Sequence, residues 1–153
     1  MLTFYCLGAA VMNEFMEHQS WADLGPYLIA SDFAAWHLAT AQHIVPFLTV
    51  SAVLLSGVLV LLCWQRPAAV PRPALLLALA CHAVFWASTI FVQWPLESAL
   101  SEGQFSPDMM TRLLRTDWPR KVLLVVEAPP AVFMAHRVLG AASAEASREL
   151  AWR

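Results

Sequence analysis

Residues 47–64 read FLTVSAVLLSGVLVLLCW, and this stretch decides the fold class. None of its side chains is charged, and a helix that spans a bilayer needs about 20 predominantly apolar residues. The stretch therefore predicts a membrane-spanning helix. The whole chain agrees with this prediction, because 59% of its 153 residues are hydrophobic and only 13% are charged. A soluble domain usually carries about 25% charged residues.

Composition and charge exclude two broad classes of protein. Disordered chains are polar and highly charged, and this chain is neither. Nucleic-acid binding requires a basic surface, whereas the formal net charge here is -2. We therefore expect the lipid bilayer, and no nucleic acid, among the partners.

Further apolar segments recur along the chain. The segment that contains residues 47–64 is longer than one span and is expected to kink at Pro46, because proline cannot donate the backbone hydrogen bond of a helix. We predict an all-α, single-domain integral membrane protein, a four-helix bundle whose second helix is long and kinked. The single domain comprises residues 1–153. It also includes a polar linker at residues 96–118 and a C-terminal surface helix at residues 140–153. The four helices are expected at about residues 2–17, 33–65, 74–94 and 119–139.

The basic residues of the loops predict the orientation. With both termini in the cytoplasm, five arginines lie inside and four basic residues lie outside. Cytoplasmic loops usually carry the excess of Lys and Arg. We therefore expect cytoplasmic termini in the inner (plasma) membrane of a bacterium.

Polar residues are expected to gather at one end of the bundle. In an antiparallel bundle, the end of the first and third helices lies beside the start of the second and fourth. Ionisable groups inside a bilayer are costly and mark functional sites. The polar end of the bundle would hold Asn13, Glu14, His18, His37, His43, Gln93, Glu97, Asp117, Arg120 and Glu127.

Five of these residues suggest a metal site or an acid–base site. Glu14 and His18 are four residues apart and share one helix face, while Glu127 lies deep in the fourth helix and needs a partner, a proton or a cation. Together with His37 and His43 they would supply the ligands of iron, zinc or manganese. We expect Glu127 and His37 to be catalytic. A non-haem iron or another transition metal is the expected cofactor, and haem b or no cofactor are the alternatives.

The third helix carries a polar and aromatic stripe. His82, Trp86, Thr89 and Gln93 fall on one face of a helix. We expect Trp86 and Gln93 to line a pocket for a flat ligand. We expect His82 to bond a neighbouring backbone group or hydroxyl, because no carboxylate is evident near it in the sequence.

Two sequence patterns resemble a known family. Residues 92–100 follow V-x-x-P-L-x-x-x-L and residues 116–120 follow T-x-W-x-R. With the stretch at residues 21–46, these resemble the anthrone oxygenase-like family of small four-helix membrane proteins, which oxidise polycyclic aromatic phenols. The resemblance implies an oxygenase and assigns no catalytic residue. The similar positions are Phe33, His37, Pro95, Leu96, Leu100, Trp118 and Arg120.

Three functions are consistent with the sequence. The first is a membrane oxidoreductase that acts on a small lipophilic or aromatic substrate. The second is a non-catalytic subunit of a larger membrane complex, with a copy of itself or another membrane protein as partner. The third is a proton- or metal-coupled carrier that uses the same polar end.

Overall fold

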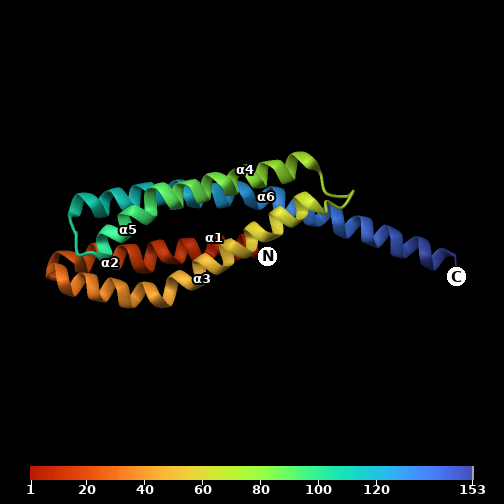
Figure 1. Cartoon of the computed structure of the whole chain (residues 1–153). Helices are drawn as coiled ribbons and strands as arrows, with labels where there is room; N and C mark the ends of the chain where they lie inside the picture. Colours follow the sequence, from red (N-terminus) through yellow and green to blue (C-terminus); the bar gives the residue numbers. More distant parts are fainter. Residues whose placement is uncertain (153) are drawn as a thin grey trace.

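The computed structural model describes residues 1–152, without the side chains of Ala30 and Ile44, and this part of the chain is helical with no strand. The helices run antiparallel to one another in an elongated bundle (Figure 1). In chain order the elements are α1 (Leu2–Met12), η1 (Asn13–His18), α2 (Gln19–Leu24), η2 (Gly25–Tyr27), α3 (Ala30–Trp64), α4 (Arg72–Ser88), η3 (Thr89–Gln93), α5 (Trp94–Ser101) and α6 (Pro107–Ala151).

The first helical run is longer than the expected residues 2–17. The α-helical turns of α1 widen into the π-helical η1 and return to α-helix in α2, so the chain stays helical as far as Tyr27. After a short extended turn, α3 runs back beside it. Figure 1 shows α3 changing direction along its length, and Pro46 lies inside this helix.

The expected linker at residues 96–118 is mostly helical. α4, η3 and α5 are continuous from Arg72 to Ser101. α6 then begins at Pro107, because the Ser106 hydroxyl accepts a hydrogen bond from the backbone N–H of Met109 and proline suits the first position of a helix. The end of the expected linker, the expected fourth helix and the expected surface helix are therefore one helix of 45 residues.

Two apolar cores lie along the bundle. α6 packs along α4, while α1 packs against both α3 and α6. One core joins α1, α3, α4 and α6, and the other joins α2 to α3, α5 and the start of α6. The buried members of the first core are Cys6, Leu55, Leu59, Val70, Leu75, Ala78, Leu124 and Met134. Those of the second are Trp21, Phe33, Leu100, Met110 and Leu113.

Three of the described helices are long and apolar enough to cross a membrane. These candidate spans are Val45–Trp64, Arg72–Ser101 and Pro107–Ala151. Their outward faces expose many large apolar side chains, as a lipid-facing surface does. The expected first span at residues 2–17 is not among the three, because the polar residues of η1 directly follow the 11 residues of α1 and lower the hydropathy of this helical run.

Candidate functional site

Two π-helical turns lie at the polar end of the bundle. η1 carries Asn13, Glu14, Glu17 and His18, and η3 begins at Thr89. A π-helical turn is rare, and it occurs frequently at functional sites because it re-aims the side chains around it. Here both turns contribute residues to the same pocket, described below.

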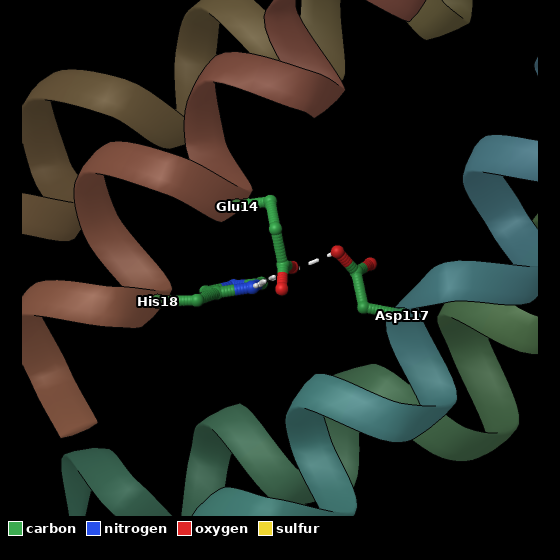
Figure 2. Close-up of side chains that lie close together, drawn as sticks. All are labelled: Glu14, His18 and Asp117. Atoms are coloured by element: carbon green, nitrogen blue, oxygen red, sulfur yellow. Dashed lines mark hydrogen bonds and ion pairs between the residues drawn. The ribbon is translucent and has the colours of Figure 1, made fainter.

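A buried group of ionisable side chains joins η1 to α6. His18 Nδ1 lies 3.2 Å from Glu14 Oε2 and 3.6 Å from Asp117 Oδ2. Figure 2 shows Glu14 and His18 projecting from one helical run toward Asp117 on the facing helix. All three residues are almost fully buried, with His18 at 0% exposure. We call these three residues with Arg120 and Lys121 the charge cluster.

Two cations balance the two carboxylates of the charge cluster. Lys121 Nζ donates to Glu14 Oε2 at 2.8 Å and also pairs with Asp117 Oδ2. Arg120 pairs with the other oxygen, Asp117 Oδ1. A buried charge is tolerated only when it is paired and hydrogen-bonded, and each carboxylate here has such a partner.

His18 is held as a neutral imidazole. Its Nδ1 donates to Glu14 and its Nε2 accepts from the side-chain amide of Asn13 at 3.1 Å. Burial lowers the pKa of His18, although the carboxylates of Asp117 and Glu14 oppose this effect. Neutral His18 therefore leaves the charge cluster with two negative and two positive groups.

The charge cluster contains the donor set of a metal site. One ligand atom each from Glu14, His18 and Asp117 lie within 4.8 Å of one another. One imidazole and two carboxylates suit zinc or a similar transition metal. However, the same carboxylate oxygens hold the ammonium group of Lys121. A divalent ion would have to displace that ammonium group and would add charge to a balanced site.

A pocket of about 360 Å³ adjoins the charge cluster. We call it the aromatic pocket, because Trp21, Phe85, Trp86 and Trp94 form much of its wall. A cavity of about 150 Å³ holds benzene, so this pocket has room for two or three fused rings. Its polar lining comes from η1, α3, η3, α5 and α6, through Asn13, Glu17, His37, Thr49, Thr89, Glu97 and Arg120.

Four buried polar atoms on this wall are orphaned, meaning that they have no hydrogen-bond partner among the described residues. Three of the four residues, Glu17, Trp21 and His37, are at most 7% exposed. Buried polar groups are nearly always hydrogen-bonded, so each orphaned atom needs an explanation such as a bound ligand. The four atoms are Asn13 Oδ1, Glu17 Oε1, Trp21 Nε1 and His37 Nε2.

The hydrogen bonds around His37 determine its tautomer. The Ser101 hydroxyl donates its one proton to the Glu97 carbonyl at 3.0 Å, so its oxygen accepts from His37 Nδ1 at 3.2 Å. The orphaned Nε2 is therefore unprotonated. Burial lowers the pKa of His37. His37 is thus a neutral base whose free lone pair lies at the pocket.

A second polar network lies deeper in the bundle. His82 Nε2 lies 2.8 Å from the Ser56 hydroxyl, and His82 Nδ1 lies 3.3 Å from Glu127 Oε2. The indole N–H of Trp86 donates to Ser56 at 2.9 Å. His82 does bond a hydroxyl as expected, but it also has the carboxylate partner that the sequence did not reveal. Trp86 links this network to the pocket wall.

The structure does not bring the five expected ligands together. Glu14 and His18 are hydrogen-bonded to each other. His37 instead packs against Trp21, and the centroids of the two rings are 4.4 Å apart. His43 is exposed, since it lies six residues after His37 and faces away from it. Glu127 pairs with His82 instead.

Only one of the two expected pocket residues lines the aromatic pocket. Trp86 lines the aromatic pocket, whereas Gln93 is fully buried and donates to Thr116 at 3.2 Å outside its lining. Sequence analysis placed Asp117 at the polar end but not among the ligands, and it missed Lys121. Their spacing of four residues on one helix, typical of an ion pair, was the available signal.

No family model matches the chain, and neither a curated protein nor a solved structure matches it significantly. The chemistry of the site is therefore argued from its geometry.

Proposed function

We propose that this chain is a membrane-embedded oxidoreductase of the oxygenase type, which acts on a small, flat lipophilic or aromatic molecule in the aromatic pocket. The observation that carries the proposal is the orphaned Nε2 of His37, a neutral and buried nitrogen on the pocket wall. A base of this kind abstracts a proton from a bound substrate. The resemblance of residues 92–100 and 116–120 to anthrone oxygenase-like proteins supports the same chemistry.

The proposed reaction starts with proton transfer to His37. Its Nε2 removes a proton from an acidic CH₂ group beside an aromatic ketone, and the resulting carbanion donates electrons to dioxygen. Overall, the CH₂ group becomes a carbonyl group, one oxygen atom enters the product and the other leaves as water. Dioxygen accepts four electrons, and the proton on His37 returns to the departing oxygen. No other oxidant is required.

A small cavity beside the aromatic pocket has room for the oxygen molecule. It measures about 70 Å³ and shares five lining residues with the aromatic pocket, namely Asn13, Leu48, Ala52, Phe85 and Arg120. A water molecule needs roughly 10–15 Å³ on this scale, so dioxygen fits. In the proposal, the two reactants lie on opposite sides of these five residues.

The proposal also completes the membrane architecture. Three helices are apolar enough to span, and α1 packs against α3 and α6, so we assign it as the fourth member of a membrane bundle. The pocket then lies near one face of the bilayer, where a lipophilic substrate is concentrated. The expected setting is a bacterial inner membrane with cytoplasmic termini.

The test is oxygen consumption by the purified full chain in nanodiscs, with 2-hydroxyanthrone, whose hydroxyl group can donate to the pocket wall, as the probe substrate. Empty nanodiscs give the rate of spontaneous oxidation. His37→Gln is expected to lower the catalysed rate about 10²- to 10⁴-fold, the usual contribution of a general base. His43→Gln is the matched control on the same helix, because His43 is exposed. A wild-type rate equal to that of empty nanodiscs, or full activity in His37→Gln, contradicts the proposal.

A metal-dependent form of this proposal is the second candidate. The donor set of Glu14, His18 and Asp117 favours it, and the ammonium group of Lys121 opposes it. Elemental analysis after incubation with Fe²⁺ or Zn²⁺ separates the two forms. Stoichiometric metal in the wild type that is lost in Asp117→Asn supports a metal. Metal retention only in Lys121→Met shows that Lys121 takes the place of the ion.

A further inference from the structure

The orphaned atoms of the aromatic pocket are mostly hydrogen-bond acceptors. Three of them, on Asn13, Glu17 and His37, accept hydrogen bonds, and only the indole nitrogen of Trp21 donates. The polarity of a buried wall determines which ligand atoms can face it, because a buried group left unpaired is costly. The identity of each acceptor follows from its neighbours.

The assignment of Asn13 follows from the charge cluster. The carboxylate of Glu14 can only accept, so His18 Nδ1 carries the proton and His18 Nε2 is the acceptor. The side-chain nitrogen of Asn13 must then donate to His18. The oxygen of Asn13 is left without a partner within the described chain.

The other two acceptors are equally well defined. His37 Nε2 is unprotonated, because Ser101 receives the proton of Nδ1. Glu17 keeps an accepting oxygen whether or not its carboxyl group is protonated. Glu17 lies four residues after Asn13, so both project from the same face of the first helical run toward the pocket.

The other donors of the lining are exposed or mostly paired. Thr49 and Trp94 are exposed. Arg120 donates to Asp117 through Nε and Nη2 and to Thr89 through Nη1 at 3.2 Å, which leaves one N–H on each terminal nitrogen. Glu97 adds further acceptors to the lining. A ligand that pairs the buried acceptors must therefore bring polar hydrogens of its own.

From this imbalance we infer that the aromatic pocket selects the reduced, hydroxylated form of a flat aromatic ligand over its oxidised, keto form. The inference rests on the proposed function and deepens it. A hydroxyl group donates to Glu17, Asn13 or His37 and still accepts from Trp21. A keto oxygen only accepts, so it leaves the three acceptors unpaired. A site built around such bonds rejects the analogue that lacks the hydrogen, and oxidation thus weakens binding and favours product release.

The test compares three ligands that have the same ring system. They are 2,3-dimethyl-1,4-naphthohydroquinone, the corresponding quinone, and the 1,4-dimethyl ether of the hydroquinone, which lacks the hydroxyl hydrogens. The methyl groups at positions 2 and 3 prevent addition of the exposed Cys63 to the quinone. Calorimetric titration of the full chain in nanodiscs under argon, with empty nanodiscs subtracted, gives each Kd.

We expect the hydroquinone to bind at least tenfold more tightly than the quinone or the ether. Glu17→Met should reduce this ratio toward one, whereas His43→Phe should leave it unchanged. The wild-type comparison stands even where a variant folds poorly. Equal or tighter binding of the quinone or the ether overturns the inference and leaves the proposed pocket intact. Failure of all three ligands to bind overturns the proposed function together with the inference.

Discussion

The charge cluster gives the sharpest test of how this protein holds charges in its interior. Lys121 is 3% exposed and pairs with Glu14 and Asp117. In Lys121→Met, Arg120 still pairs with Asp117, so one carboxylate, that of Glu14, loses its cation. Breaking a buried pair by removing one partner costs about 3–5 kcal/mol. At about 2–4 °C per kcal/mol for a chain of this size, the Tm should fall by roughly 6–20 °C.

The assay is thermal and denaturant unfolding of the purified full chain, followed by circular dichroism and tryptophan fluorescence. The double variant Lys121→Met, Glu14→Gln removes both charges and should recover at least about 1–2 kcal/mol relative to the sum of the single changes. Arg115→Met is the matched control, because Arg115 is exposed on the same helix, and it should change stability by less than about 0.5 kcal/mol. A Lys121→Met protein as stable as the wild type would refute the reasoning.

Two further predictions concern stability. A Cβ at Gly25 would clash with the ring of Phe105, so Gly25→Ala should cost about 1–3 kcal/mol through overpacking. Gly8→Ala, with nothing within 4 Å of the added Cβ, should not destabilise the protein, and equal effects of the two changes in the same unfolding assay would contradict this difference. The lowered pKa of His18 means that the unfolded chain takes up more protons than the folded one below about pH 6.5, the usual pKa of histidine. Stability should therefore be highest above that pH and fall as the pH decreases; His18→Gln should reduce the slope of this dependence, and an unchanged slope would contradict the assignment.

Much of the helical architecture follows from local sequence. The uncharged run at residues 47–64 predicts a helix, and the structure has one there in α3. The region after residue 96 was harder to predict, because its charged and polar residues are typical of a loop. The Ser106–Pro107 pair starts a helix locally, and α6 then continues through Pro119, Pro129 and Pro130. Packing along α4 outweighs the proline penalty in a way that composition does not reveal.

The candidate site was predictable only where its residues share one helix. The spacing of Glu14 and His18 correctly predicts that they meet. The partner of Glu127 depends on how α4 and α6 are aligned along each other, which pairs it with His82, 45 residues earlier. No local pattern specifies that alignment. The same reason hides Lys121, whose partner Glu14 lies 107 positions away.

The length of α6 has a practical consequence. Its 45 residues extend about 68 Å at 1.5 Å per residue, more than twice the roughly 30 Å of hydrocarbon in a bilayer. The last part of the helix leaves the bundle (Figure 1), and every residue from Ala135 to Trp152 is exposed. A domain fused to its end would therefore be held away from the rest of the bundle. A helical fusion in register with this helix would give a 16.9 kDa protein the added mass and fixed orientation that electron cryomicroscopy needs.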